Sequence, residues 1–94
     1  MSTKVNASHI LVKTEAEAKQ LLELVNAGKS FEELAHEKSL CPSGKKGGSL
    51  GWFSHGQMVR EFEKVAFSMK KETVSAPFKT QFGWHILKVN DSSG

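Results

Sequence analysis

The sequence has few of the features that mark secreted or membrane proteins. Cys41 is the only cysteine among the 94 residues, so an internal disulfide cannot form. No apolar run approaches the roughly 20 residues that a membrane-spanning helix needs. The first residues also lack the apolar stretch of about 7–15 residues that a signal peptide contains. We therefore expect a cytoplasmic protein with no membrane-spanning segment.

The chain also has no large excess of positive or negative charge. The chain has 13 Lys and Arg residues against 10 Asp and Glu residues, and its longest basic runs are the pairs Lys45-Lys46 and Lys70-Lys71. Proteins that bind nucleic acids usually carry a dense basic patch or stripe. We expect no dedicated nucleic-acid site, and weak binding through a mildly basic surface is the third-ranked hypothesis.

The composition is that of one small soluble domain. Hydrophobic residues make up 38% of the chain and charged residues 24%, which is ordinary for a folded globular protein. A chain of 94 residues is long enough for one compact domain and too short for two. We expect a single domain over residues 1–94, with frayed ends at 1–4 and 91–94.

The first half of the chain predicts a strand and two helices. Apolar residues on both faces of 5–13 predict a strand at the centre of a sheet. Capping boxes at Thr14-Glu15-Ala16-Glu17 and Ser30-Phe31-Glu32-Glu33 predict two helix starts. The second helix ends near Ser39-Leu40, and the first stops at Gly28. The apolar face of the first helix consists of Ala18, Leu21, Leu22 and Val25.

Glycine is concentrated in the middle of the chain. Five of the eight glycines lie within 41–56, which predicts turns or a close approach of backbone or ligand. Their spacing fits no phosphate-binding loop. We expect a short strand over 49–53, a third helix over about 59–69, and final strands around 73–80 and 83–90. The order β-α-α-β-α-β-β indicates an α+β domain with a mixed or antiparallel sheet.

His9, His85 and Cys41 are the candidates for chemistry. Each histidine lies mid-strand among aliphatic residues, where a single histidine is most often a core residue, but the two can pair if their strands are neighbours. Cys41 allows three hypotheses: a nucleophile activated by histidine, a zinc ligand together with both histidines, or a polar group lining a pocket. The nucleophile has no evident orienting partner, and closely spaced zinc-ligand pairs are missing.

Large apolar residues at loop edges indicate a possible groove. Leu50, Met58, Phe62 and Phe82 lie in or beside glycine-rich and turn segments, where such residues often line a binding groove. The alternative is that they are simply core residues, and composition alone favours that alternative.

Four motifs resemble one protein family. They are SHILVK at 8–13, FEELAHEKS at 31–39, CPSGKKGGSLGWFSHGQMVREFEKVAF at 41–67 and TQFGWHILKV at 80–89. Together they resemble the parvulins, which are peptidyl-prolyl cis-trans isomerases, and in particular the small stand-alone bacterial parvulins. The resemblance implies an FKBP-like βαααβαββ domain in which helices surround a four-stranded antiparallel sheet. It adds a short helix near residues 42–44.

The resemblance also implies the residues of the site. The catalytic set consists of the paired His9 and His85, the neighbouring Thr80, and Cys41 at a position that is Cys or Asp in the family. Neither a metal nor a cofactor is implied. The substrate-binding set, a proline pocket with its rim, consists of Leu50, Gln57, Met58, Phe62 and Phe82.

The implied function is non-covalent rotation about X–Pro bonds in unfolded or flexible polypeptides. Parvulins directed to phosphorylated Ser-Pro or Thr-Pro carry a basic loop after the first strand, whereas here the short acidic segment 14–17 follows directly. Glu61 and Trp84 also replace the proline and tyrosine that the family often has. We expect a monomer that is independent of phosphorylation, with proline-containing peptides and unfolded proteins as partners. The alternative is a noncatalytic chaperone or proline-peptide-binding module.

Overall fold

The computed structural model describes residues 4–93. Its elements are β1 (Lys4–Val12), α1 (Glu15–Asn26), α2 (Phe31–Lys38), the 3-10 helix η1 (Pro42–Lys46), β2 (Ser49–Ser54), α3 (Arg60–Ser68), β3 (Phe78–Thr80) and β4 (Gly83–Ser93). This order confirms the βαααβαββ arrangement and the α+β class. The short helix expected near 42–44 is η1.

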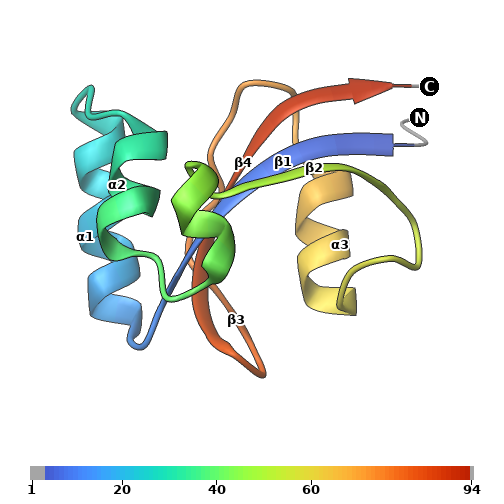
Figure 1. The fold of residues 1–94 in the computed structure, drawn as a ribbon. Coiled ribbons are helices and arrows are strands. Elements are labelled where there is room, and N and C mark those ends of the chain that lie inside the picture. Colours follow the sequence, from blue (N-terminus) through green and yellow to red (C-terminus); the bar gives the residue numbers. More distant parts are fainter. Residues whose placement is uncertain (1–3, 94) are drawn as a thin grey trace.

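The strands form one antiparallel sheet in the order β2-β1-β4-β3. β1 therefore lies inside the sheet, as its two apolar faces predicted. Figure 1 shows α1 and α2 together on one side of the sheet, which we call the helix-pair side, and α3 on the other, which we call the groove side. The ends of the described chain lie side by side, because Lys4 pairs with Ser93.

Each side of the sheet has its own core because successive strand residues point to opposite faces. The core of the helix-pair side includes Ile10, Ala18, Leu21, Phe31 and Ile86, and Leu22 and Val25 pack against it. This packing confirms the predicted apolar face of the first helix. The core of the groove side includes Val5, Ala7, Phe53, Phe62, Leu87 and Val89.

Both predicted helix starts are confirmed. Thr14 Oγ1 accepts the Glu17 N–H at 3.2 Å, and Ser30 Oγ accepts the Glu33 N–H at 3.3 Å. Each bond satisfies a backbone donor that has no partner inside its helix. Gly28, just beyond α1, has φ = +105°, and this left-handed residue ends the helix as predicted.

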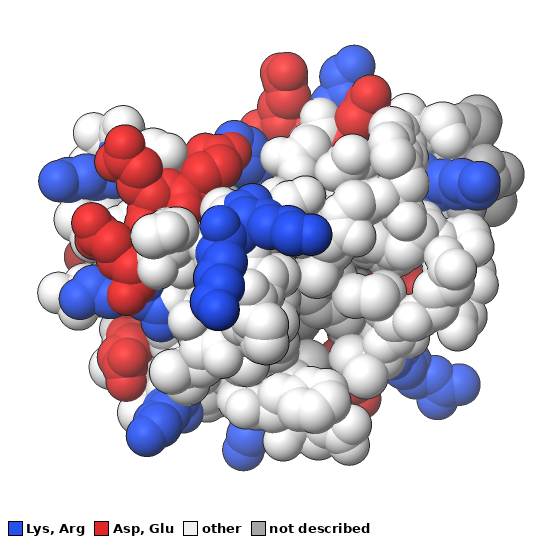
Figure 2. All heavy atoms as spheres, in the orientation of Figure 1, with Lys and Arg blue, Asp and Glu red and all other residues white. Residues whose placement is uncertain are grey.

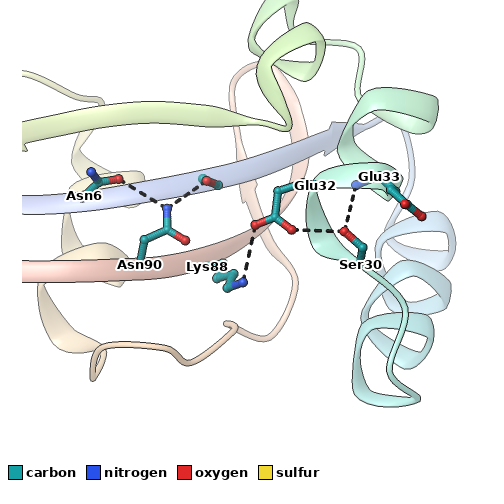
Figure 3. Close-up of polar contacts among 7 residues, drawn as sticks. Asn6, Ser30, Glu32, Glu33, Lys88 and Asn90 are labelled. Atoms are coloured by element: carbon teal, nitrogen blue, oxygen red, sulfur yellow. Dashed lines mark hydrogen bonds and ion pairs between the residues drawn. The ribbon is translucent and has the colours of Figure 1, made fainter.

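The helix-pair side changes from apolar to polar toward the ends of the chain. There the Asn90 side-chain amide donates to Asn6 Oδ1 at 3.3 Å and to Ser8 Oγ at 3.0 Å. We call these three residues the asparagine cluster. Lys88 Nζ lies 3.6 Å from Glu32 Oε1 and connects this part of the sheet to α2 (Figure 3). Hydrogen-bonded polar side chains thus occupy the part of the sheet that α1 and α2 leave partly open.

The strand expected over 73–80 is wrong in its length, since β3 is only Phe78–Thr80. Val74 forms an isolated bridge to β4. Ser75 Oγ accepts an N–H of β4 at 3.0 Å, so a side chain replaces the backbone carbonyl of a regular ladder. Pro77 follows and has no N–H to donate. Serine and proline therefore delay the start of the strand.

The chain ends also differ from the expectation of fraying. Asp91–Ser93 continue β4, and Lys4 begins β1 opposite Ser93. Pairing of the two strands gives their backbone groups partners up to these positions. The remaining residues of that expectation, 1–3 and 94, lie outside the described part of the chain.

Candidate active site

The two central strands bring His9 and His85 together. His9 lies in β1 and His85 in β4, and the strands pair so that His85 is opposite Leu11 and His9 is opposite Leu87. The histidines are therefore diagonal neighbours on one face, and their Nδ1 atoms are 3.0 Å apart. Both side chains are buried. Residues 76 positions apart in the sequence thus form one pair, as the resemblance implied.

A hydroxyl group lies at each end of the histidine pair. Thr80 Oγ1 is 2.7 Å from His85 Nε2, and Ser43 Oγ is 3.2 Å from His9 Nε2. The Phe82 N–H donates to Thr80 Oγ1 at 3.2 Å, which fixes the threonine. Ser43, His9, His85 and Thr80 form a continuous chain of hydrogen bonds, which we call the histidine network.

One assignment of protons satisfies every bond in the histidine network. In this assignment Thr80 Oγ1 accepts the Phe82 N–H, and the Thr80 hydroxyl donates to His85 Nε2. His85 then carries its proton on Nδ1 and donates to His9 Nδ1. His9 carries its proton on Nε2 and donates to Ser43 Oγ. The Ser43 hydroxyl is then free to donate to Cys41 Sγ, which lies 3.3 Å away.

Both histidines are uncharged at neutral pH. Burial, and next the nearby His85, lower the pKa of His9 to about 4. Burial also lowers the pKa of His85 below its ordinary value. The network therefore acts through fixed N–H and O–H dipoles rather than through a positive charge.

Phe62 packs against the histidine network and helps to form an apolar groove. Its ring meets His9 edge-on, with ring centroids 5.4 Å apart and planes at 85°, and it meets His85 at 5.9 Å and 82°. Phe62 extends from the buried face of α3. The groove above it encloses about 460 Å³, which lies within the usual range for small-ligand sites.

The structure brings eight of the nine predicted site residues to this groove. They are His9, Cys41, Leu50, Gln57, Met58, Phe62, Phe82 and His85. Thr80 is buried behind His85. Leu50 and Met58 are half-buried, whereas Phe82 is 63% exposed, as expected for pocket and rim. Figure 2 shows a hollow near the centre of one face, surrounded mostly by uncharged atoms, while carboxylates gather over α1 and α2.

Sequence reasoning missed several groove residues and one member of the network. Leu11, Leu40, Pro42 and Val59 also line the groove. Leu11 could have been found, because it shares the His9 face of β1. Ser43 had no signal in the sequence, since only the turn of η1 brings its hydroxyl to His9.

Backbone contacts hold η1 against β1 beside the histidines. The Leu40 N–H donates to the Leu11 carbonyl at 2.8 Å, and the His9 N–H donates to the Gly48 carbonyl at 3.0 Å. Gly48 has φ = +84°, and a Cβ there would collide with the His9 carbonyl oxygen. The glycine cluster thus includes the close backbone approach that its composition predicted.

The zinc hypothesis for Cys41 finds no support in this geometry. The Nδ1 atoms of His9 and His85 face each other, and both Nε2 atoms face hydroxyl groups. No ring nitrogen of the pair is therefore left to bind a metal beside the thiol. Within residues 4–93, no group of three or more His, Cys, Asp or Glu side chains could hold a metal ion.

Comparisons with known proteins point to one family. Residues 3–91 match the rotamase family, described as the PPIC-type PPIase domain. The chain is 55% identical, over 94% of its length, to the foldase protein PrsA 1 of Bacillus cereus. It is 46% identical, over 97% of its length, to PrsA of Bacillus subtilis. It spans only 31% and 32% of the length of these two relatives.

Two solved structures, one of a longer chain and one of a chain of similar length, have the same fold as this chain. PrsA from Bacillus anthracis has a TM-score of 0.96 at 40% identity, over 99% of this chain and 43% of that one. The parvulin of Nitrosopumilus maritimus has a TM-score of 0.85 at 42% identity, over 100% of this chain and 99% of that one. The family match and the shared fold lead to one conclusion: the chain belongs to the parvulins, the family of PPIC-type peptidyl-prolyl cis-trans isomerase domains.

Proposed function

We propose that this chain accelerates rotation about X–Pro bonds in unfolded or flexible polypeptides without requiring a phosphorylated residue. One observation carries the proposal: an apolar groove sized for a small ring lies over Phe62, which rests on two uncharged, hydrogen-bonded histidines. The groove binds the proline ring, with Leu50 and Met58 beside it.

The groove lowers the barrier without forming a covalent bond. Rotation about an X–Pro bond must break amide resonance, a barrier of roughly 18–20 kcal/mol. Water favours the planar, charge-separated amide, so a groove that excludes water weakens that preference. In the twisted state the prolyl nitrogen becomes pyramidal and accepts a hydrogen bond, so a donor there favours the transition state. A thousandfold to millionfold acceleration needs about 4–8 kcal/mol of this preference.

The histidine network keeps the groove in its shape, and Cys41 acts without covalent attack. Cys41 lies at the groove wall, and its sulfur accepts the Ser43 hydroxyl. In this proposal the Cys41 thiol hydrogen, which the histidine network does not use, polarises the turning carbonyl. No leaving group is displaced in the rotation, so the reaction needs no nucleophile.

The short connection after β1 supports independence from phosphorylation. β1 ends at Val12 and α1 begins at Glu15, so only two residues separate them. The first turn of α1 carries the exposed acidic residues Glu15 and Glu17. Neither the two-residue connection nor this turn supplies a cluster of basic side chains that would bind a phosphate group. An uncharged X–Pro segment is therefore the preferred substrate.

The partners and the cellular setting extend the same proposal. Relatives are called foldases, and two related Campylobacter jejuni proteins, one of them periplasmic, are described as SurA-like chaperones. These names favour unfolded, proline-containing chains as the partners of this protein. From the sequence, we further propose that the protein is a monomer and is located in the cytoplasm. Among residues 4–93, no helix is long and apolar enough to cross a membrane.

Exchange spectroscopy by NMR tests the proposal directly. An Ala-Leu-Pro-Phe peptide is followed with and without the protein, beside the same peptide carrying phosphoserine before proline. We expect faster cis–trans exchange of the uncharged peptide and weaker acceleration of the phosphorylated one. Binding without faster exchange would instead support a noncatalytic binding module, and a requirement for phosphate would overturn the proposed specificity.

A further inference from the structure

Residues 55–59 connect β2 to α3 and supply one wall of the groove. Gln57, Met58 and Val59, at the end of this connection, all line the groove. The connection contains no helix or strand of its own. The position of Met58 against the proline ring therefore depends on how this loop is held.

A tight turn folds the loop back on itself. The Gln57 N–H donates to the Ser54 carbonyl at 3.3 Å. Gly56, at the third position of this turn, has φ = +89°, as a type II turn requires. The Gln57 side chain reinforces the turn, because its Oε1 accepts the Ser54 N–H at 2.6 Å and the Ser54 hydroxyl at 3.2 Å. Gln57, predicted as a rim residue, thus also shapes its own loop.

Glu63 fastens this turn to α3 from outside the groove. The Gly56 N–H donates to Glu63 Oε1, and His55 Nδ1 lies 3.5 Å from Glu63 Oε2. The His55 ring stacks on Phe67, with centroids 3.8 Å apart and planes at 26°. Glu63 and Phe67 are four residues apart on α3 and so share one face of the helix. The bond from Gly56 also lowers the pKa of Glu63 below its ordinary value.

The same helix holds the floor and the wall of the groove. Phe62 forms the floor and directly precedes Glu63 in α3. Movement of the loop relative to α3 would therefore change the distance between Met58 and Phe62. Contacts from Glu63 oppose that movement, although Glu63 itself does not line the groove.

We infer that Glu63 is a positioning residue that sets the width of the proline groove by holding the Gly56 N–H and His55. This inference rests on the proposed function, since it assigns a role in binding the proline ring. It concerns the distance between Met58 and Phe62 and involves no contact between Glu63 and substrate.

Three variants test the inference. Glu63→Ala removes the acceptor of the Gly56 N–H, Glu63→Gln keeps an oxygen that can accept it, and Glu61→Ala removes an exposed carboxylate of the same helical turn. For Glu63→Ala we expect KM to rise roughly tenfold with a smaller change in kcat. Glu63→Gln should recover most of this loss, and Glu61→Ala should match the wild type. Urea unfolding of each variant separates these effects from loss of the fold.

NMR of the free protein gives a second measurement that does not depend on activity. In the wild type, the Gly56 amide proton shift should titrate with the Glu63 carboxylate, with a midpoint below that of an ordinary glutamate. In Glu63→Ala this titration should disappear and the Met58 methyl signal should shift. A wild-type Gly56 amide that does not titrate, or an unchanged KM in folded Glu63→Ala, would overturn the inference. If the wild type lacks isomerase activity, the proposed function fails, while the NMR titration still decides whether Glu63 holds the loop.

Discussion

The helix-pair side and the groove side use the same two central strands for different purposes. On the helix-pair side, Asn6 and Ser8 of β1 meet Asn90 of β4 at the partly open end of the sheet. On the groove side, His9 and His85 form an equally well-bonded pair. Alternation along a strand places these two polar groups on opposite faces.

The difference between the two polar groups lies in what covers them. Phe62 packs edge-on against both histidines, Phe78 stacks on His85, and both histidines are nearly free of solvent, whereas Asn6 and Asn90 remain half-buried. In an environment shielded from water, dipoles interact more strongly and the pKa values of titratable groups shift. Hydrogen bonding between polar side chains is therefore not sufficient for a functional site. On the groove side, apolar packing shields the bonded histidines from water, and the adjacent groove provides space for a ligand.

The largest expected effect is a loss of stability without a loss of activity. Leu21 is a buried α1 residue of the helix-pair core, and Leu21→Ala should lower the free energy of unfolding by about 2–5 kcal/mol. The same variant should keep the wild-type kcat/KM per folded molecule, because Leu21 does not line the groove. Urea denaturation and peptide exchange on the same sample measure both quantities. A large fall in kcat/KM of the folded fraction would show that the two sides are coupled.

The second effect is a pH dependence that arises on the groove side. Since burial lowers the pKa of His9 from 6.5 to about 4, the unfolded chain binds a proton in this interval that the folded chain does not. Stability is therefore complete above pH 6.5 and falls between pH 6.5 and 4, by roughly 3 kcal/mol for this group. Denaturant unfolding at several pH values should show this slope.

A His9→Gln variant provides the control for the pH effect. Glutamine cannot be protonated, so the variant should lose less stability than the wild type over the same interval. Isomerase activity of the wild type should stay level from pH 8 to 6.5 and decline as the histidines gain charge. Equal slopes for both proteins would locate the pH dependence elsewhere in the molecule.

The local parts of the fold could be predicted from the sequence because they depend on neighbouring residues. Thr14 and Ser30 fixed two helix starts through bonds to residues three positions away. The strand over 73–80 was misjudged because Ser75 exchanges a backbone partner for a side-chain one, and nothing in its immediate neighbourhood indicates that exchange. Local patterns thus give the elements, and contacts between distant residues decide their limits.

The site was predicted unevenly for the same reason. Residue patterns alone predicted that His9 and His85 could pair if their strands were neighbours, and the resemblance supplied that pairing across 76 positions. Ser43 could not be predicted, because its contact with His9 depends on both the turn of η1 and the register of β1. Glu63 was hidden too, since the bond from Gly56 joins a loop to the outer face of α3.

Met58→Ala should give the next largest effect, and it is the counterpart of Leu21→Ala. Met58 is half-buried at the groove wall and packs against the edge of the groove-side core, so its removal widens the proline pocket and costs less stability than the loss of a fully buried side chain. We expect kcat/KM to fall roughly tenfold, or about 1.4 kcal/mol, with a much smaller change in the free energy of unfolding. Exchange NMR with the Ala-Leu-Pro-Phe peptide measures the first quantity. An unchanged kcat/KM would mean that proline binds elsewhere.

A smaller effect compares one hydroxyl of the histidine network with one amide of the asparagine cluster. Ser43→Ala leaves His9 Nε2 without its partner, and Asn90→Ala removes the bonds to Asn6 and Ser8. Each should cost about 1 kcal/mol of stability. Only Ser43→Ala should lower kcat/KM and move the 15N shifts of the His9 ring toward the other tautomer. Equal activity losses in both variants would contradict the division between the two sides.

Cys41→Ser should give the smallest effect on the groove side. The serine hydroxyl can accept the Ser43 hydroxyl as the sulfur does and can still present a hydrogen to the groove, so the network keeps its direction. Because the rotation displaces no leaving group, kcat/KM should stay within a factor of about three of the wild type, less than 1 kcal/mol. Peptide exchange measures this ratio, and an unchanged unfolding curve shows that the variant is folded. A folded Cys41→Ser protein without activity would instead require covalent attack by the thiol, and the site would then depend on one reactive atom rather than on an apolar cover above a neutral network.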